Sequence, residues 1–560
     1  MSGSTPSAPW SRRERATAAL VFLAGVVLRI VFLVHVKGEY LFQRPLLDAE
    51  YYHRWALEIA AGDWLGASRG LFMMSPGYSY LLAVVYTLFG TTATVVAVVQ
   101  MLLGVACAWM IFRIGAVHFS RETGLIAAAL SLLYAPGIFY ESVLLKATLV
   151  NALNVGALLA VSAGHPAGWL LSGLLAGFSA HLRPTALLLV PVLLLWLWRR
   201  SPRRILAVSL LAGGVLLALV PVALRNKLVG GEWVWTTAHG GMNFYTGNSP
   251  GTRGPYTSPP FARTDAAFEQ GDFLREASRR SGAALTPAQS SRYWYAETWR
   301  VIRQDPRRAA GLILNKTLIF FNRYEPSINA DYESYRREFG SVLSLPLVSL
   351  AALLPLALLG LARARPNALL LGYLAVVLVG NVVFFVTSEY RFPAVPVLCV
   401  YAGWGVCRLL ADIRARASRR LALSAAALLL LVWAVSFDLY GTLLGMPDYE
   451  RVNGARSAYN LGWVYQEAGR SEAAITAYRD AVRLDPAFAE PHNNLGVLLS
   501  GQGRELEAVA EFEKVLALRQ GVPEAHRNLG ALLARLGRRQ EAQQHLQEAQ
   551  RLEQLRDGPR

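Results

Sequence analysis

Cysteine and charged residues are both scarce in this 560-residue chain. Its three cysteines, Cys107, Cys399 and Cys407, lie inside or at the ends of apolar stretches, and no two of them form a CxxC pair. We therefore expect neither a disulfide framework nor a cysteine-bound metal. Only 17% of the residues are charged, whereas 54% are hydrophobic. This composition is too apolar for a soluble protein of this length, so the sequence predicts a membrane protein.

Acidic residues are the scarcer of the charged types, with 38 Asp and Glu against 55 Lys and Arg. The positive excess is confined to one part of the chain, because the tail from residue 455 onward contains 14 basic and 14 acidic residues. Short basic clusters between apolar runs are typical of the cytoplasmic loops of membrane proteins. We therefore expect no nucleic-acid partner.

Long apolar runs dominate the first 440 residues, and several approach the roughly 20 residues needed to cross a bilayer. The first run follows "SRRER", is too long for a signal-peptide core and has no small-residue cleavage site after it, so we expect a retained anchor. The other runs lie near residues 76–90, 92–112, 122–140, 147–164, 167–198, 204–224, 342–362, 367–387, 392–410 and 420–440.

The arginine clusters between the runs predict the topology. All of them lie on the cytoplasmic side if run 76–90 does not cross and run 167–198 crosses twice. A break at Arg183-Pro184 allows the double crossing, because a residue before proline disfavours helix. The sequence therefore predicts an all-α membrane domain with about eleven crossings, the N-terminus inside the cell and the C-terminus outside.

This topology puts three charged positions at outer helix ends: Asp48, Glu141 and Arg183. Charged residues close to a bilayer are costly and usually functional. Asp48 could instead be a helix N-cap, and Glu141 could be an ordinary loop charge with Lys146 as its ion-pair partner. Arg183 has no acid beside it in the sequence and is suited to an anion such as a phosphate.

Arg391, in "SEYRFPAVP", is a further candidate for binding an anion at an outer helix end. It lies beside Glu389, so a local ion pair or snorkelling at the membrane interface is the alternative. Asp48 opens the stretch "DAEYYHRWALEIAAGDW", whose aromatic residues recur at helical spacing. We expect this stretch to form an interfacial helix that shapes a lipid entrance.

Two outer loops, 37–91 and 225–341, are predicted to carry the site. The second contains "TTAHGGMNFYTGNSPGTRGPYTSPP", which is too rich in Gly, Asn and Pro for regular structure. A divalent metal is possible, with Glu50 or His239 as a ligand, but nothing in the sequence demands one; a lone histidine is more often structural. The residues expected to contact substrate are Tyr51, Tyr52, His239, Asn243 and Tyr245.

The tail repeats every 34 residues. Leu461-Gly462, Leu495-Gly496 and Leu529-Gly530 keep this spacing, as do small and large apolar positions after each pair. The pattern resembles the tetratricopeptide repeat and predicts an α-solenoid of three repeats over 455–556, joined by a linker at 441–454 to the membrane domain of 1–440. The asparagine before each Leu-Gly could bind a protein or peptide partner, or could brace neighbouring repeats: Asn460, Asn494 and Asn528.

The order of the membrane features resembles that of the GT-C glycosyltransferases, a group that includes protein O-mannosyltransferases and the bacterial aminoarabinose transferase. The resemblance covers about 1–440. It rests on an acid followed by tyrosines in the first outer loop, a second acid, Arg183-Pro184, a long outer loop and "EYRFPAVP". The chain has Asp-Ala-Glu where the group often has Asp-Glu, so the role of Glu50 stays open.

The resemblance implies a polyprenyl-phosphate sugar donor, a membrane-lipid environment and an active site outside the bacterial inner membrane. We expect Asp48 to act as general base on an acceptor hydroxyl, with inversion at the anomeric carbon. Glu141 would assist Asp48 or orient Arg183. The leaving phosphate needs cations, and the candidates are Arg183, Arg391 and Lys146.

Two other functions remain open at this point. An oligosaccharyltransferase similar to O-antigen ligases would place its key His or Arg in the late outer loop, and Asp48 would be dispensable. A membrane-anchored scaffold would act only through the repeats. The scaffold needs neither many crossings nor charges near the bilayer, so the sequence favours an enzyme.

Overall fold

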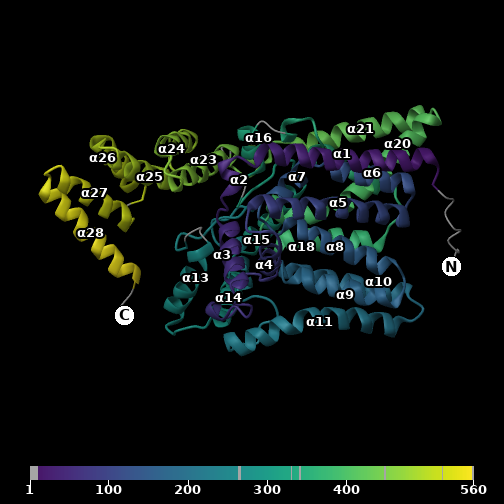
Figure 1. Cartoon of the computed structure of the whole chain (residues 1–560), viewed down its shortest axis with the longest axis horizontal. Helices are drawn as coiled ribbons and strands as arrows, with labels where there is room; N and C mark the ends of the chain where they lie inside the picture. The colour runs from purple at the N-terminus through teal and green to yellow at the C-terminus, as the bar shows by residue number, and fades with distance from the viewer. Residues whose placement is uncertain are drawn as a thin grey trace. The chain divides into compact units, whose positions relative to one another are not determined.

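The computed structural model describes residues 10–262, 266–329, 331–339, 342–446, 449–519 and 521–557. The predicted all-α class is confirmed, since these residues contain helices and only two isolated β-bridges, Tyr134–Val348 and Pro255–Val386. The chain divides into two units, residues 1–439 and 440–560 (Figure 1), and each is described by itself.

The first half of the membrane unit contains helices that alternate between long apolar segments and short connecting ones. They are α1 (Arg12–Val36), α2 (Tyr40–Gln43), α3 (Asp48–Ala60), η1 (Ala67–Arg69), α4 (Gly77–Phe89), α5 (Ala93–His118), α6 (Arg121–Leu132), α7 (Ala135–Ser142), α8 (Ala147–Ser162), α9 (Pro166–Ala180), η2 (Pro184–Leu188), α10 (Leu189–Arg200) and α11 (Arg204–Gly230).

The second half begins with the helices of the long loop and ends with further apolar helices. They are α12 (Gly240–Asn248), α13 (Ala266–Ser281), α14 (Pro287–Gln304), α15 (Pro306–Phe321), α16 (Tyr332–Phe339), η3 (Val342–Ser344), α17 (Leu350–Arg363), α18 (Ala368–Val383), α19 (Ser388–Arg391), η4 (Phe392–Ala394), α20 (Val395–Arg414) and α21 (Ser418–Ser436). A short α22 (Leu439–Thr442) lies at the boundary between the units.

The predicted count of about eleven crossings is not confirmed. Within the described residues, five helices are long and apolar enough to cross a membrane: α1, α5, α11, α21 and the helical stretch Ser388–Arg414. A sixth span results if α7 and α8, which meet at an angle of 114°, are counted together. Four further apolar helices, α4, α9, α17 and α18, are shorter than 18 residues.

Two of the expected runs are interrupted in the structure. The run 167–198 breaks where proline predicts, because α9 ends at Ala180 and η2 begins at Pro184. The run 122–140, expected to be one crossing, is divided into α6 and α7 by a turn at Leu133 and Tyr134. Such breaks in apolar segments are tolerated where the backbone is buried in protein.

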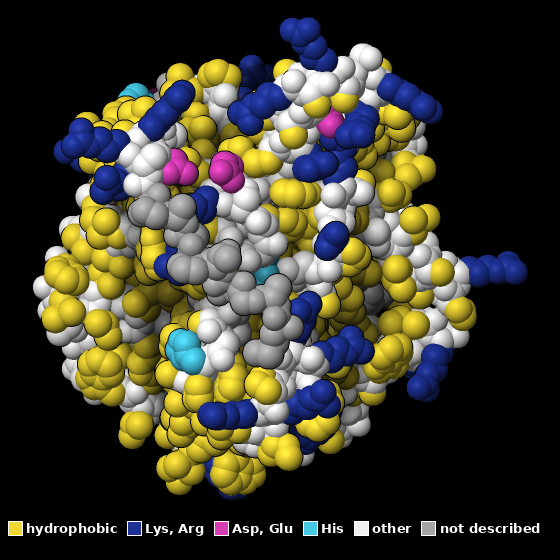
Figure 2. Space-filling view, turned by 90° about the vertical axis from the view of Figure 1, so that its right-hand side faces the viewer, with side chains coloured by type: hydrophobic (Ala, Val, Ile, Leu, Met, Phe, Trp, Pro, Cys, Tyr) yellow, Lys and Arg dark blue, Asp and Glu magenta, His cyan; other side chains and the backbone are white. Residues whose placement is uncertain are grey.

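One end of the membrane unit is basic. In Figure 1, α1 begins at the right, and the connections from α10 to α11 and from α20 to α21 lie at the same end. Asn367, at the start of α18, lies 3.0 Å from His118 at the end of α5, and Arg363 at the end of α17 pairs with Asp412 near the end of α20. Figure 2 shows this face with many Lys and Arg side chains and few acidic ones. The arginine clusters predicted to share one side therefore do share one face.

The aromatic residues of α3 form part of the protein core. Tyr52, Trp55 and Ile59 are at most 1% exposed and lie on the face of α3 that packs against α4 and the loop that precedes α4. The expectation that these aromatic residues lie at the membrane interface is therefore wrong. The stretch is helical, as its spacing predicts, but the apolar stripe faces protein. Only Trp64, beyond the end of α3, is substantially exposed, at 49%.

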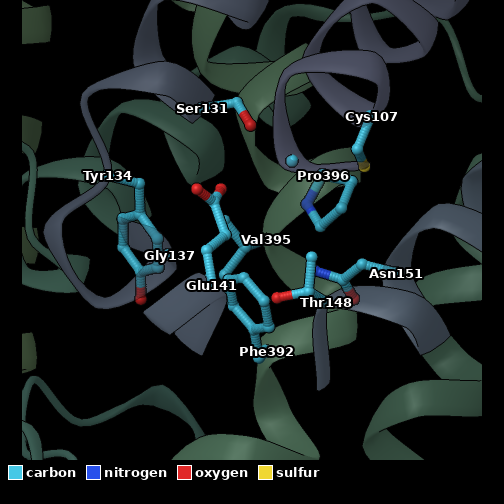
Figure 3. A pocket seen from close by; sticks show the side chains of 11 residues that line it. Cys107, Ser131, Tyr134, Gly137, Glu141, Thr148, Asn151, Phe392, Val395 and Pro396 are labelled. Carbon is cyan, nitrogen blue, oxygen red and sulfur yellow. The ribbon is translucent and has the colours of Figure 1, made fainter. Parts of the chain in front are cut away.

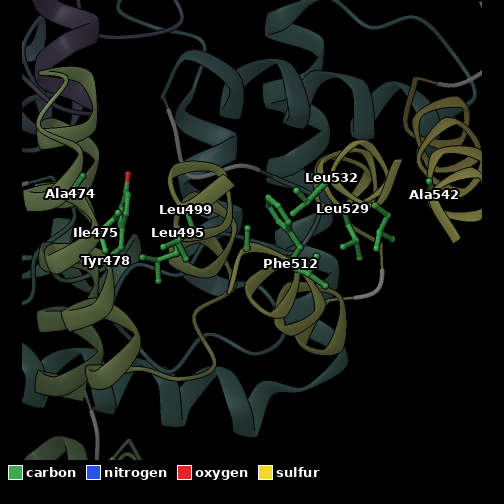
Figure 4. Packing of buried hydrophobic residues seen from close by; sticks show 12 residues of the cluster. Ala474, Ile475, Tyr478, Leu495, Leu499, Phe512, Leu529, Leu532 and Ala542 are labelled. Carbon is green, nitrogen blue, oxygen red and sulfur yellow. The ribbon is translucent and has the colours of Figure 1, made fainter. Parts of the chain in front are cut away.

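The tail consists of three antiparallel helix pairs, α23 (Tyr449–Glu467) with α24 (Ser471–Leu484), α25 (Ala489–Gly501) with α26 (Glu505–Leu518), and α27 (Pro523–Arg535) with α28 (Arg539–Asp557). The first helix begins at Tyr449, within the segment expected to be a linker. Gly496 lies so close to the ring of Phe512 that an added Cβ would be 2.7 Å from it. This approach explains the repeated Leu-Gly, and Figure 4 shows the apolar residues that pack along the stack.

Candidate functional site

Four charged residues from separate segments lie at the end of the helices that is opposite the basic face. Asp48 is the first residue of α3, Lys146 directly precedes α8, Arg183 directly precedes η2, and Glu389 lies in α19. Both α8 and α10 run from this region to the basic face. The sequence predicted Asp48 and Arg183 on this side, and the structure adds Glu389.

The backbone immediately before Asp48 is strained. Leu47 has φ of 53°, a value that residues with a branched side chain rarely adopt. Leu47 is also the N-cap position of α3, so the alternative that Asp48 is merely the N-cap does not hold. Strain of this kind costs about 1–3 kcal/mol and is concentrated at functional sites.

Asn329 connects the two carboxylates of the cluster. Its Nδ2 donates to Asp48 Oδ2 at 3.1 Å and lies 3.5 Å from Glu389 Oε2. Asn329 comes from the segment that follows α15, at the far end of the long loop. One amide therefore connects two acids that come from opposite ends of the membrane unit.

Arg183 is held by Glu389 and by an aromatic ring. Its Nη2 donates to Glu389 Oε1 at 2.9 Å, its Nη1 donates to the Glu389 carbonyl at 3.2 Å, and the guanidinium lies 4.1 Å from the centre of the Tyr390 ring. Its Nε–H is buried and has no hydrogen-bond partner among the described residues. A buried guanidinium with an unused donor is a site for an anion.

Lys146 does not pair with Glu141, contrary to the alternative that the sequence left open. Its Nζ donates to the Tyr52 hydroxyl at 2.7 Å. Burial raises the pKa of Tyr52 well above its usual value, and the negative charges of Asp48 and Glu389 raise it further. Tyr52 therefore stays neutral, and Lys146 lies in the same cluster as Asp48 and Glu389.

Glu141 lies apart from this cluster and is paired with Arg29 in the middle of α1. Arg29 Nε and Nη2 donate to the two carboxylate oxygens of Glu141 at 2.6 and 2.7 Å, and both side chains are almost fully buried. Gln100 of α5 donates to the Glu141 carbonyl at 3.1 Å. The predictions that Glu141 assists Asp48 or orients Arg183 are therefore not supported. Its carboxylate is instead paired with a different arginine, Arg29.

A small cavity adjoins Glu141, as Figure 3 shows. The volume that the centre of a water molecule can occupy in this cavity is about 20 Å³. Thr148 Oγ1 and Asn151 Oδ1, which belong to its lining residues, are buried and have no hydrogen-bond partner among the described residues. A cavity of this size with polar walls fits one water molecule and is too small for a sugar or a lipid.

Arg391 is also occupied by the protein itself. Its Nη2 donates to Glu325 Oε2 at 2.8 Å and to the Tyr324 carbonyl at 2.7 Å. Its Nη1 donates to three carbonyls at the end of α15, those of Ile319, Phe320 and Asn322. The expected local pair with Glu389 does not form, and contact with a donor phosphate is not supported. Arg391 instead fastens the end of α15 to α19.

The residues expected to bind substrate have different environments. Tyr51 and Tyr52 lie in the first turns of α3, beside Asp48. His239 directly precedes α12; burial and the charge of Lys146 lower the pKa of His239 to about 4, so its ring is neutral. Its Nδ1 is buried without a partner among the described residues. Tyr245 packs against Trp294 in an aromatic core, and Asn243 lies partly buried in α12.

The residues proposed for a divalent metal do not fit that role. Glu50 forms an ion pair with Arg54, one turn further along α3. The positive charge of Lys146 acts on His239 and disfavours a second cation beside its ring. Among the described residues, no group of three or more His, Cys, Asp or Glu side chains is arranged to hold a metal ion. We therefore assign no step of the reaction to a metal at these positions.

The asparagines of the tail take part in contacts between repeats. Asn494 Nδ2 donates to the Tyr478 hydroxyl of the preceding repeat at 3.0 Å, and Asn528 Nδ2 lies 3.3 Å from Asn493 Oδ1. Asn460 occupies the corresponding position in the first repeat and is partly buried. For Asn494 and Asn528, these contacts support the bracing alternative over direct capture of a peptide.

Asn329 could not be identified from the sequence, because an isolated asparagine in a loop has no distinctive pattern. In the sequence, Glu389 is distinguished only as a neighbour of Arg391. Arg29 stands inside the first apolar run, and a charge in such a run needs a buried partner. That rule predicts an acid in contact with Arg29, although it does not identify Glu141.

Comparison with known proteins agrees with the predicted glycosyltransferase domain and with the predicted repeats in the tail. Residues 74–224 match the dolichyl-phosphate-mannose-protein mannosyltransferase family, and residues 462–503 and 493–522 match tetratricopeptide repeats. The first range contains Lys146 and Arg183 and begins after Asp48. The resemblance to GT-C glycosyltransferases with C-terminal tetratricopeptide repeats is confirmed, and the chain is a glycosyltransferase.

Three solved structures are similar to parts of this chain. The archaeal oligosaccharyltransferase AglB from Archaeoglobus fulgidus is 12% identical with a TM-score of 0.42, covering 80% of this chain and 58% of AglB. ArnT from Cupriavidus metallidurans, bound to undecaprenyl phosphate, is 16% identical with a TM-score of 0.34, covering 70% of this chain and 78% of ArnT. MamA is 21% identical with a TM-score of 0.18, and the match covers 27% of this chain and 78% of MamA. No curated protein matches the sequence.

Proposed function

We propose that this chain transfers a sugar from a polyprenyl-phosphate donor to a hydroxyl group of a protein, lipid or glycan on the outer face of a bacterial inner membrane. The observation that carries the proposal is the convergence of Asp48, Lys146, Arg183 and Glu389 at one end of the helices. The site combines a carboxylate for a hydroxyl with cations for a phosphate, and the family match over residues 74–224 supports this pairing.

Asp48 acts as the general base. It accepts a hydrogen bond from Asn329, and a carboxylate has about four acceptor sites, so it can accept from more than one donor. As the hydroxyl oxygen attacks the anomeric carbon, its proton moves to Asp48, and the bond from that carbon to the phosphate oxygen breaks. Because attack comes from the side opposite the leaving phosphate, the configuration at the anomeric carbon inverts.

Arg183 and Lys146 hold the donor phosphate. Arg183 offers the buried Nε–H that has no partner among the described residues, and its guanidinium plane is fixed on Tyr390. Lys146 is held by the neutral hydroxyl of Tyr52 rather than by an acid in direct contact. Negative charge grows on the phosphate as it leaves, so prearranged cations stabilise the transition state more than the bound donor. Glu389 orients Arg183.

The charge pattern supports the orientation in the membrane. The basic face in Figure 2 would lie in the cytoplasm, since positive residues accumulate on that side. The cluster around Asp48 would then face the outside, where a polyprenyl-linked sugar meets its acceptor. In this orientation α21 leads the chain outward, and the repeats would recruit a protein partner there.

The test is transfer by the purified full chain from a panel of polyprenyl-phosphate sugars. Asp48→Asn should abolish transfer, because the amide cannot take the hydroxyl proton. Glu39→Gln is the matched control, since Glu39 is an exposed carboxylate in the same outer segment and makes no side-chain cap contact. Full activity of Asp48→Asn, in a variant that stays folded, would refute the assignment and favour a base in the late outer loop.

A further inference from the structure

A group of large apolar side chains is exposed at the end of α11 that is opposite the basic face. They come from the last turns of α11 and from two loops, residues 61–71 after α3 and residues 231–237 after α11. Each is between 49% and 75% exposed, and together we call them the tryptophan surface: Trp64, Leu65, Leu228, Trp233 and Trp235. Contiguous exposed apolar residues mark a contact with a partner or with a membrane.

Arg225 of α11 fixes the first of the two loops. Its Nε donates to the Leu65 carbonyl at 2.7 Å, and its two Nη atoms donate to the carbonyls of Gly66 and Gly70. These glycines have φ of 57° and 55°, a region that favours glycine, so the loop can turn both carbonyls toward the guanidinium. The guanidinium also lies 3.6 Å from the centre of the Phe72 ring. The loop therefore has a defined shape on α11.

Asn226, the next residue of α11, fixes the second loop. It is fully buried, and its Nδ2 donates to the Val234 carbonyl at 2.9 Å and lies 3.3 Å from the Thr236 carbonyl. Its Oδ1 accepts from the Phe72 N–H at 3.3 Å, and the Phe72 carbonyl accepts from the Ala238 N–H at 3.0 Å. The two loops therefore lie side by side, and two successive residues of one helix hold them.

The tryptophan surface continues an exposed apolar face of α11. Four residues of this face recur at a spacing of four and are each at least 45% exposed: Leu216, Val220, Leu224 and Leu228. α11 is long and apolar enough to cross a membrane, and it lies at the lower edge of the membrane unit in Figure 1. The exposed Leu206 and Leu228 are about 33 Å apart along the helix, at a rise of about 1.5 Å per residue. A hydrocarbon core of about 30 Å fits between them.

This length puts Leu228 at the boundary of the hydrocarbon core and the following tryptophans just beyond it. Trp233 and Trp235 follow within the next loop, and Trp64 lies in the loop beside them. Tryptophan rings are enriched at this level of a membrane, where one part of the ring is apolar and its N–H is polar. Lys227 is exposed there and donates to the Gly231 carbonyl at 3.0 Å, so a cation lies at the level of the lipid phosphates.

We propose that the tryptophan surface inserts into the lipid headgroup layer at the end of the membrane unit opposite the basic face, with Arg225 and Asn226 holding its two loops in shape. Lipid is the occupant, because the surface extends a helix face that is already apolar along the length of a bilayer. The first loop continues α3, whose first residue is Asp48. The anchor therefore also fixes the level of α3 at the membrane surface. The proposal does not depend on sugar transfer.

Fluorescence quenching by brominated phospholipids tests the insertion. The full chain is placed in lipid nanodiscs with bromine either near the headgroup or in the middle of the acyl chains. The emission of the three tryptophans is the difference between the wild type and a variant with Trp64→Phe, Trp233→Phe and Trp235→Phe, which keeps aromatic rings at these positions. We expect this difference emission to lose most of its intensity with the shallow bromines and less with the deep ones.

The control is Trp463, an exposed tryptophan of the repeat tail. The difference emission between the wild type and Trp463→Phe should keep its intensity in both lipids. If the emission of the three tryptophans also keeps its intensity in both, the tryptophan surface does not contact lipid and the proposal is overturned. Stronger quenching by the deep bromines than by the shallow ones would equally contradict an interfacial position.

Hydrogen exchange measured by mass spectrometry tests the role of Arg225. Arg225→Lys should accelerate exchange in residues 61–71, because lysine cannot reach three carbonyls with a forked head. Residues 231–237, which Asn226 holds, should keep the wild-type rate, as should both loops in the control Lys227→Arg. Wild-type exchange of residues 61–71 in Arg225→Lys would refute the role of Arg225.

The same three-tryptophan variant distinguishes lipid from a second copy of the chain. If the wild type is a dimer in nanodiscs, the variant is a monomer and the difference emission is not quenched by lipid, the surface binds another copy and the proposal fails. If the emission is quenched by the shallow bromines and the number of copies is the same in both proteins, lipid is the partner.

Discussion

Replacing Glu141 alone by leucine should destabilise the membrane unit far more than replacing Glu141 and Arg29 together. The pair has two hydrogen bonds of 2.6 and 2.7 Å, and both residues are less than 5% exposed. Removing one member of a buried ion pair leaves an uncompensated charge and costs about 3–5 kcal/mol, whereas replacing both by apolar residues is often neutral. The expected difference is therefore about 150- to 5,000-fold in the unfolding equilibrium.

Denaturant unfolding in detergent of four proteins, the wild type, Glu141→Leu, Arg29→Leu and the double variant, measures this coupling. Arg29 also donates to the carbonyls of Gly25 and Leu132, so its single variant should be destabilised as well. The double variant should recover stability and, with it, transfer activity. A double variant that is stable but inactive would contradict the structural role of Glu141 and return it to the catalytic residues.

Two further predictions concern the phosphate site and the tail. Arg183→Lys should lower kcat/KM for the donor about 10- to 100-fold without unfolding the protein, because lysine cannot replace the forked guanidinium; an unchanged kcat/KM in steady-state assays would exclude Arg183 from donor binding. Gly496→Ala should destabilise the tail by about 1–3 kcal/mol, since its Cβ would meet the ring of Phe512. Gly501→Ala, where nothing lies within 4 Å, is its control in thermal melts of the full chain.

Features governed by local pattern could be predicted from the sequence. The 34-residue period identified the repeats, because each Leu-Gly packs on a large side chain of its own repeat. Pro184 marked the break before η2, since proline restricts the residue that precedes it. The arginine clusters identified one face of the membrane unit, because such charges avoid the bilayer. The topology that follows from this face correctly predicts Asp48 and Arg183 at the opposite end of the helices.

Partners that are distant in the chain could not be predicted. Glu389 pairs with Arg183 across 206 positions, and Arg29 pairs with Glu141 across 112. Spacing carries no information on such pairs, so the nearby Lys146 was a reasonable but mistaken partner for Glu141. The stripe with Trp55 shows a second limit: helical periodicity indicates that one face is apolar, but not whether that face meets lipid or protein.

The central claim is that Asp48 removes the proton of the acceptor hydroxyl. The most direct measurement is the rate of sugar transfer by Asp48→Asn beside Glu39→Gln, with the anomeric configuration of the wild-type product determined in the same experiment. We expect no transfer by Asp48→Asn, wild-type transfer by Glu39→Gln and an inverted product. Wild-type transfer by a folded Asp48→Asn, or a product with retained configuration, would contradict the account.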